Sequence, residues 1–327
     1  MIICTGRFIG ACLAAAFFLP VAHAAQGDPA AGYPNRPIRL IVPFAPGGGT
    51  DTTARTIAQK LGEKWGQQTL VDNRAGAAGT IGMDIAAKAN ADGYTICLIS
   101  ASIPVDAATH PSLPYDLVND FQGITQATSL FYVVYVHPSL PVKSIRDLIA
   151  HAKAHPGKLN FGASGTLQPL AGELFNHMAG VKIVRVPYKG TAAVIPAMLS
   201  GEVQLGYGSL IGTRAQIQAG RLRGIAITAT KRSPVIDLPT VAESGLPGYE
   251  VDQWYGIVTS AKAPKSIVMK LNGAMVEALR EPDVAKRLAG DGSTPVGSSP
   301  GEFNAHIRSE INKWKKLAKE ANLQLHN

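Results

Sequence analysis

Cysteine is nearly absent from this sequence, which has only three in its 327 residues: Cys4, Cys12 and Cys97. A chain with so few thiols has no disulfide framework to hold its core together. Cys97 stands inside the apolar run YTICLIS, where a thiol most often packs as a small apolar side chain. We therefore expect Cys97 to be a buried structural residue without a disulfide.

Apolar runs long enough to span a bilayer are also missing, since a spanning helix needs about 20 such residues. One shorter run occupies residues 8–21, after the cation Arg7, and Ala22-His23-Ala24 follows it with the A-x-A pattern of a cleavage site. We interpret residues 1–24 as a signal peptide cleaved near Ala24, which predicts an exported protein. An alternative is a lipoprotein acylated at Cys12, because the residues before it loosely resemble a lipobox.

Concentrated charge is missing too, because charged residues make up only 17% of the chain and aromatic residues only 6%. The formal net charge is +8, but the cations are scattered, apart from modest clusters such as INKWKKLAKE. A nucleic-acid interface needs a basic patch interleaved with aromatic side chains, so we expect no nucleic-acid partner. The positive balance fits an anionic ligand or an anionic membrane surface better.

Motifs for catalysis, metals and cofactors are absent as well. Gly162-Ala163-Ser164-Gly165 lacks the closing glycine of the G-x-S-x-G nucleophile motif. His151 and His155 have the i, i+4 spacing of two zinc ligands, but the glutamate of HExxH is missing, which favours surface histidines near a helix end. We therefore expect no catalytic residue, no metal and no cofactor, and a protein that is not an enzyme. An exported α/β enzyme is the competing class.

What the sequence does contain is an alternation of apolar, β-type runs with helical patterns, which is typical of α/β folds with largely parallel sheets. Two segments echo each other: LIVPFAPGGGTD and IVRVPYKGTAA each combine an apolar strand, Val-Pro-aromatic and a loop of small residues that leads into a helix. This echo predicts two similar lobes whose strand-to-helix loops face each other across a cleft. We assign residues 33–128 and 250–327 to a discontinuous lobe 1, and residues 129–249 to lobe 2.

The first of these loops, Ala45–Asp51, has the features of an anion site. Its glycines let a ligand approach without meeting a Cβ, and the following helix has unpaired N–H groups in its first turn. The loop lacks the lysine of a P-loop, and Thr52 replaces the third glycine of a dinucleotide-binding loop. We expect Thr50 or Asp51 to be the helix N-cap, with a structural role for Asp51. A tight turn that needs glycine only for its shape is the alternative.

Several longer segments resemble a known family. They are YPNRPIRLIVPFAPGGGTD, VDNRAGAAGTIGMDIAAKANADGYTI, YDLVNDFQGIT, VPYKGTAAVIPAMLSGEV, LPTVAESGLPGYEVDQWYGI and FNAHIRSEINKW. Together they resemble the substrate-binding proteins of tripartite tricarboxylate transporters, the Bug family. The resemblance implies a periplasmic protein with a type II-like binding-protein fold, in which two α/β lobes, each a mostly parallel sheet flanked by helices, close on a small organic anion.

The same resemblance implies a carboxylate ligand, which the protein delivers to the membrane permease subunits of a tripartite tricarboxylate transporter. We expect a monomer. A ligand-binding module that serves a signalling system is an alternative that the sequence leaves open.

The resemblance also indicates where the ligand binds, in the loop matching Ala45–Asp51 and in a second loop matching residues 162–170 of the other lobe. The predicted ligand-binding residues are Phe44, Ala45, Gly47, Gly48, Gly49, Thr50, Ser100, Ser102, Ser164, Gly165, Thr166, Tyr188, Gly190, Thr191 and Gly208. Trp254 and Tyr255 have two interpretations, packing at the hinge or a wall of the ligand site.

Two departures from the family pattern bear on the ligand. The segment GASGTLQPL is shorter than the usual second loop and has Pro169 where histidine is usual, and Gly208 stands where an acidic residue is common. A cleft without that acid has nothing to pair with an ammonium group. We therefore expect a di- or tricarboxylate, or an aromatic carboxylate, in preference to an amino acid.

Overall fold

The structure, a computed structural model, describes residues 1–2, 28–110, 112–164, 166–188, 191–290 and 292–320. The predicted signal peptide, residues 1–24, lies almost entirely outside these ranges and stays a prediction. None of the helices in the described ranges combines the length and the apolar character that a membrane span demands.

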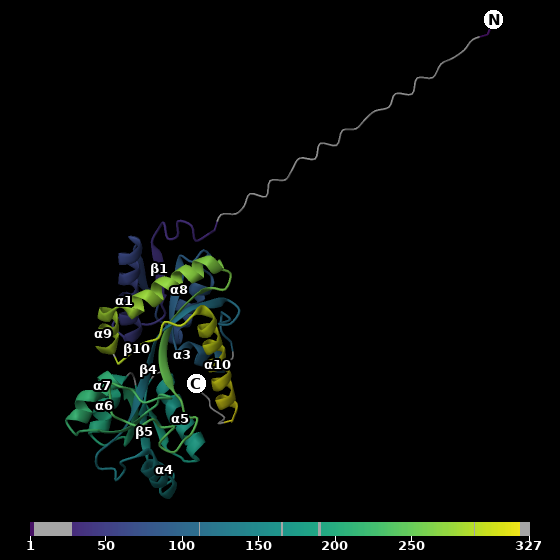
Figure 1. Ribbon diagram of the computed structural model, residues 1–327. Coiled ribbons are helices and arrows are strands. Elements are labelled where there is room, and N and C mark those ends of the chain that lie inside the picture. Colours follow the sequence, from purple (N-terminus) through teal and green to yellow (C-terminus); the bar gives the residue numbers. More distant parts are fainter. Residues whose placement is uncertain (3–27, 111, 165, 189–190, 291, 321–327) are drawn as a thin grey trace.

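The upper half of the molecule in Figure 1 is built on one mixed sheet. Its parallel strands are β2 (Thr69–Asn73), β1 (Ile38–Val42) and β3 (Thr95–Ser100), in that order. Strand β9 (Asp252–Ser260) then runs antiparallel to β3, and β4 (Phe121–Val136) runs antiparallel to β9. The short β10 (Thr294–Pro295) pairs with β4. Residues near both ends of the chain therefore share one sheet.

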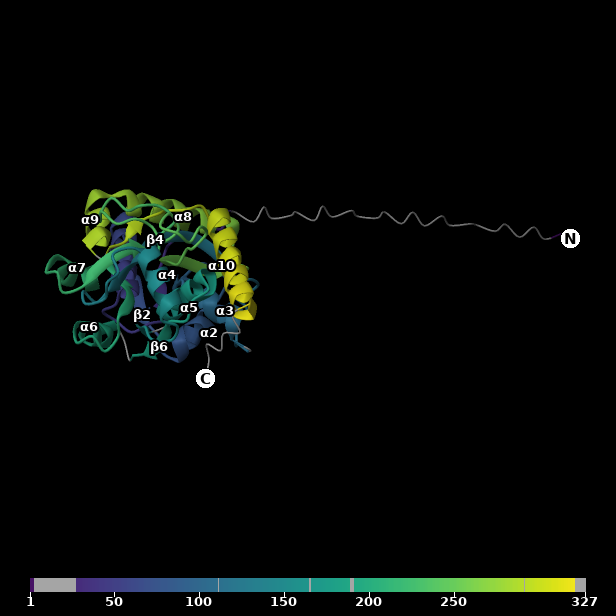
Figure 2. The same ribbon diagram turned by 90° about the horizontal axis from the view of Figure 1, so that it is seen from below.

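Helices cover both faces of this sheet. They are α1 (Gly49–Trp65), the 3-10 turn η1 (Ala77–Gly79), α2 (Thr80–Ala87), α3 (Ser102–Thr109), α8 (Lys265–Arg280), α9 (Pro282–Gly290) and α10 (Pro300–Glu320). Seen from below, α8 and α9 lie along the top edge of the molecule, α10 runs down the right-hand edge beside α3, and α2 lies toward the bottom (Figure 2). The last helix, α10, buries an apolar stripe made of Phe303, Ile307, Ile311 and Trp314.

The lower half has a second group of strands around the C-terminal part of β4. That part pairs antiparallel with β7 (Leu205–Ser209) and β8 (Arg223–Ile227), while β5 (Asn160–Ala163) runs parallel to β7 and to β6 (Val184–Pro187). The helices of this half are α4 (Ile145–Ala154), α5 (Leu167–Ala179), α6 (Thr191–Leu199) and α7 (Leu210–Gln218). The expected α/β fold is confirmed, but its strands form one continuous mixed sheet flanked by helices. The expectation of a mostly parallel sheet in each half is wrong, because β9 and β4 insert antiparallel pairs between the parallel sets β2-β1-β3 and β7-β5-β6.

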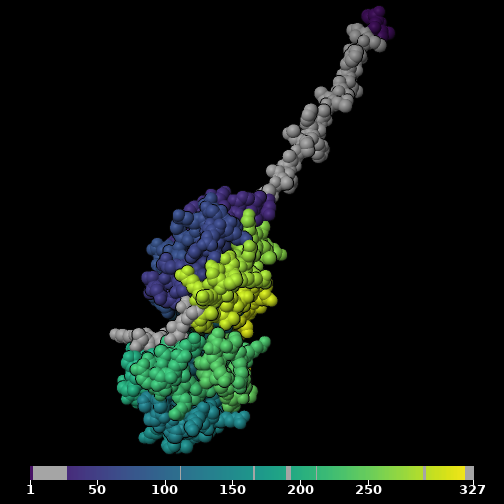
Figure 3. Space-filling model, turned by 60° about the vertical axis from the view of Figure 1, so that its left-hand side comes forward, coloured from purple at the N-terminus to yellow at the C-terminus, as the bar shows by residue number. Residues whose placement is uncertain are grey.

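Strand β4 belongs to both halves. Phe131 is its last residue paired with β9, and Tyr132 is its first residue paired with β7. The chain crosses back just before Asp252, where β9 begins. The two halves form separate bodies in the space-filling view, one purple, blue and yellow, the other teal to green (Figure 3). These crossings lie close to the boundaries predicted at 128/129 and 249/250, and the exact division into lobes stays a prediction.

Local signals in the sequence account for several element ends. Ser144 accepts a hydrogen bond from the backbone N–H of Asp147 and caps α4, and helices α1 and α5 end at the left-handed glycines Gly66 and Gly180. Cys97 is buried in the central strand β3, as expected of a structural residue. Burial raises the pKa of its thiol.

Candidate ligand-binding site

A cavity of about 500 Å³ lies between the two halves, within the range typical of small-molecule sites. Its lining residues are Phe44, Ala45, Gly48, Gly49, Thr50, Ala78, Ser100, Ser102, Tyr132, Ser164, Thr166, Leu167, Gln168, Gln253 and Tyr255. These come from strands β3, β4 and β9, from the turns and helices that follow β1, β3 and β5, and from η1, which follows β2. None of these fifteen described residues is an aspartate, glutamate, lysine, arginine or histidine.

The upper side of the cavity is the beginning of helix α1. Gly48 is the N-cap residue, with an extended backbone, and the helix starts at Gly49. The N–H groups of the first helical turn have no partner within a helix, so they point toward the cavity side with the positive end of the helix dipole. A Cβ at Gly49 would lie 2.6 Å from the hydroxyl oxygen of Tyr255, so only glycine allows this tyrosine to pack against the helix start.

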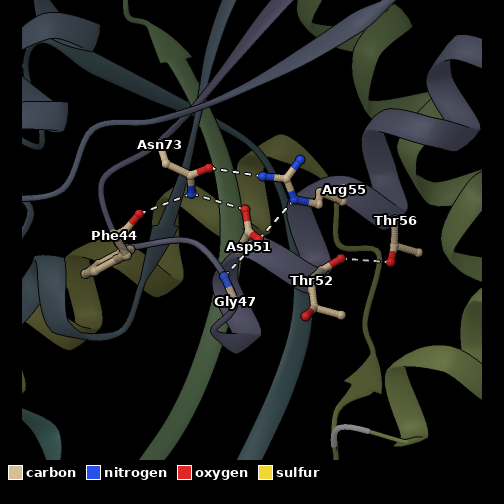
Figure 4. A network of polar contacts seen from close by, with 7 residues as sticks. All are labelled: Phe44, Gly47, Asp51, Thr52, Arg55, Thr56 and Asn73. Carbon is tan, nitrogen blue, oxygen red and sulfur yellow. Dashed lines mark hydrogen bonds and ion pairs between the residues drawn. The ribbon is translucent and has the colours of Figure 1, made fainter. Parts of the chain in front are cut away.

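The expectation that Thr50 or Asp51 caps this helix is wrong, because the helix begins earlier and Asp51 is its third residue. From that position the Asp51 carboxylate reaches back past the N-cap Gly48 and accepts the N–H of Gly47 at 3.0 Å, one residue before the N–H that a capping box would use (Figure 4). It also accepts from Arg55 Nε at 3.0 Å and from Asn73 Nδ2 at 3.1 Å. The predicted structural role of Asp51 therefore has a different geometry.

This network fixes the shape of the loop. Asn73, at the end of β2, also donates to the carbonyl oxygen of Phe44 at 3.2 Å, and Gly47 has a φ of +89°, which an L side chain would strain (Figure 4). Burial raises the pKa of Asp51, but the hydrogen bonds from Arg55, Gly47 and Asn73 outweigh it, so the net shift is downward. The carboxylate is thus ionised and already paired with Arg55.

Small residues and hydroxyls line the rest of the upper side. The hydroxyl oxygens of Ser100 and Ser102 lie 2.8 Å apart at the junction of β3 and α3. Ala78 lies in η1 with a left-handed backbone, φ +54°, which is uncommon for a residue other than glycine. The two serine hydroxyls share one hydrogen between them, so one of them has its own hydrogen available for a ligand.

The lower side of the cavity is the beginning of helix α5. Thr166 is the N-cap residue, and its side chain makes no capping hydrogen bond. The Oε1 atom of Gln168 accepts from the backbone N–H of Ser164 at 2.9 Å and from its hydroxyl at 3.0 Å. A second helix start, from the other half of the molecule, therefore opens on the same cavity as α1.

Aromatic rings form part of the wall. Tyr255 and Tyr132 both line the cavity, and burial raises the pKa of Tyr132, which keeps its phenol neutral. Trp254 points the other way along β9: it is fully buried, and its ring meets the Phe303 ring edge-on at 5.5 Å. Of the two interpretations left by the sequence, Trp254 fits core packing and Tyr255 fits the ligand wall.

The structure brings nine of the predicted residues into the lining. They are Phe44, Ala45, Gly48, Gly49, Thr50, Ser100, Ser102, Ser164 and Thr166. Gly47 is in the same loop but turned to Asp51. The hydroxyl of Tyr188 donates to Glu202 at 2.7 Å, away from the lining residues. Gly165 and Gly190 lie outside the described residues, and for Thr191 only the backbone, at the start of α6, is described.

Gly208 lies in β7 beneath the ring of Tyr135, where an added Cβ would be 3.0 Å from Cε1 of that ring. It is not among the lining residues, so an acid at this position would need its neighbours to move. The lining residues that the sequence did not single out are Ala78, Tyr132, Leu167 and Gln168, together with Gln253. For Gln168 a signal was available, because a glutamine early in a helix is typical of a capping arrangement.

The arrangement favours an anion held without cations. Backbone N–H groups of two helix starts, a hydroxyl of the Ser100–Ser102 pair, threonine hydroxyls and two glutamine amides line one open cavity, and these groups are able to donate hydrogen bonds. Hydrogen bonds to a charged acceptor are the strong ones.

Residues 53–323 match the family described as "Tripartite tricarboxylate transporter family receptor". The chain is 36% identical over 313 residues to protein BugT of Bordetella pertussis, which covers 94% of this chain and 96% of that protein. It is similar to the solved structure of a periplasmic transporter, with 38% identity, a TM-score of 0.76, and coverage of 90% of this chain and 100% of the other. It is also similar to R. palustris Rpa4515 with adipate, with 37% identity, a TM-score of 0.76, and coverage of 89% and 98%.

Proposed function

Because this chain belongs to the tripartite tricarboxylate transporter receptor family, we propose that it binds a small organic carboxylate in the cavity between its halves and delivers it to the permease of such a transporter. The ligand is a di- or tricarboxylate or an aromatic carboxylate. The protein acts in the periplasm as a monomer, without catalysis.

The observation that carries this proposal is the pair of helix starts, α1 from the upper half and α5 from the lower half, that line one cavity. Each helix start favours negative charge within its first turn, so a ligand with an acidic group at each end fits both. The similar R. palustris structure is that of a protein with adipate, a dicarboxylate, which supports the same class of ligand.

The lining also supports a preference against amino acids. An ammonium group buried in the cavity would need a carboxylate or several acceptors, and the described lining residues include no aspartate or glutamate. Gly208 stands where the family pattern commonly has an acidic residue, and no lining residue provides a carboxylate in its place.

A thermal-shift screen of the mature protein tests the proposal. The ligands are adipate, succinate, citrate and phthalate, with aspartate and glutamate as amino-acid comparators. A ligand with micromolar affinity, present at millimolar concentration, should stabilise the folded state by about 4 kcal/mol, because stabilisation follows RT ln(1 + [L]/Kd). Tight binding of aspartate or glutamate with no response to the plain acids contradicts the proposed ligand class. Turnover of a stabilising ligand contradicts the proposal of a binding protein without catalysis.

A further inference from the structure

Gln168 has an amide whose orientation the structure fixes. Its Oε1 atom meets two groups of Ser164, the backbone N–H at 2.9 Å and the hydroxyl at 3.0 Å. A backbone N–H is only a donor, so the amide atom that it meets must be the oxygen. The Nε2 atom therefore lies on the other side of the amide, away from Ser164.

The two N–H groups of Nε2 are left for the cavity. Gln168 is only 5% exposed and lines the space between the halves. Within the described ranges, Nε2 has no acceptor at hydrogen-bond distance, whereas both bonds of Oε1 are made. Nε2 is not among the buried atoms without a partner in the described residues, so it is accessible from the cavity, and a ligand that brings a charged acceptor there forms a strong hydrogen bond.

A capping role alone does not require this amide. An acceptor that reaches back to an N–H before the helix is the arrangement of a capping box, and glutamate serves there as well as glutamine. Glutamine differs from glutamate in one respect: the second atom of its head group is a donor instead of a charged acceptor. The identity of residue 168 thus matters to the ligand rather than to the helix.

We propose that Gln168 sets the ligand specificity of this cavity: Ser164 holds its amide so that Nε2 donates to a ligand carboxylate and repels any ammonium group there. This inference rests on the proposed function and adds a named residue to it. An α-amino acid differs from the matching dicarboxylate by one ammonium group. That group is itself a hydrogen-bond donor, so it cannot accept from Nε2 of Gln168, and the amino acid is disfavoured.

The test is the substitution Gln168→Glu, which keeps an oxygen for both bonds from Ser164 and replaces only the donor. Dissociation constants are measured by calorimetry at pH 8 for three matched pairs: succinate and aspartate, glutarate and glutamate, adipate and 2-aminoadipate. Within each pair the ligands differ by one ammonium group. For the pair whose dicarboxylate binds wild type best, we expect the preference for the dicarboxylate to fall on the order of 10- to 100-fold. The melting temperature of the ligand-free protein should stay close to that of wild type, because the helix contact is kept.

Gln253→Glu is the matched control, since Gln253 lines the same cavity from β9 and no hydrogen bond orients its amide among the described residues. We expect a smaller change in preference from this variant. An equal change in both variants shows a general effect of negative charge and overturns the role of Gln168. An unchanged preference in Gln168→Glu overturns it as well. A wild-type protein that binds none of the three dicarboxylates contradicts the proposed function itself, and this inference with it.

Discussion

Asp106, on helix α3, is a carboxylate buried without a partner. It is 3% exposed, and neither of its oxygens meets a hydrogen-bond donor among the described residues. Burial raises its pKa from 3.8 to about 7. The folded protein therefore holds a proton on Asp106 at pH values where the unfolded chain has lost it, which makes folding weaker as the pH rises from about 4 to about 7.

Replacing Asp106 by asparagine removes this titration. We expect the free energy of unfolding of Asp106→Asn, relative to that of wild type, to be higher at pH 8.5 than at pH 5, by on the order of 1–4 kcal/mol. Urea unfolding at the two pH values measures the gain. Asp252, whose pKa burial also raises to about 7, is present in both proteins and cancels in the comparison. A difference between variant and wild type that is the same at both pH values contradicts the assignment.

At the scale of elements, the first turn of α1 depends on Asp51, which joins the loop at Gly47 to Arg55 and Asn73. We expect Asp51→Asn to destabilise the protein by about 1–3 kcal/mol at pH 7, because charged hydrogen bonds are lost at a buried site. The folded-state pKa of Asp51 is depressed, so its contribution is complete above 3.8, the ordinary value, and is lost as the pH falls through the lowered pKa. The penalty of the variant should shrink in that acid range.

The control for this prediction is Asp283→Asn, the same substitution at an exposed carboxylate, one of three acidic side chains that pair with Lys60. Exposed pairs contribute little, so its effect should stay below about 1 kcal/mol. If urea unfolding shows that both variants lose the same free energy of unfolding, the Asp51 network contributes no more to stability than an exposed ion pair.

Strong local signals made some elements predictable from the sequence. Ser144 is a residue type that favours a helix N-cap and marks the start of α4, and the continuous apolar run YTICLIS is typical of a buried strand such as β3. The first half of β4 has no clear strand pattern, because Gln122, Thr125 and Gln126 interrupt its apolar residues, and its partner β9 lies far away in sequence. Helix α3 is equally hard to predict, because Pro104 in its first turn looks like a breaker, although a proline is tolerated there.

The candidate site shows the same limit. The glycine loop and the serines after β3 were found because a strand followed by small residues is a local pattern. Tyr132 and Gln253 line the cavity only because β4 and β9 cross between the halves there, which no local pattern encodes. The role proposed for Gln168 depends on the orientation of its side-chain amide, and that orientation is visible only in its contact with Ser164.

At the scale of the whole molecule, the lining residues come from both halves, while β4 and the segment before Asp252 connect them. A ligand that contacts both sides stabilises the arrangement in which they are close. We expect the radius of gyration, measured by small-angle X-ray scattering, to decrease when a stabilising carboxylate is added. A carboxylate that does not stabilise the protein serves as the control. An unchanged radius with a bound ligand would indicate that the halves do not move on binding.

The sharing of β4 also imposes an order in time. As the chain emerges from its N-terminus, β4 meets its lower-half partners β7 and β8 before β9 exists. The lower sheet is therefore able to finish first, while β3 and the first part of β4 keep open edges until residues 252–260 arrive. The half that contains the first strand is the last to be completed, and any chain that stops short of β9 leaves two strand edges free to pair with a neighbour.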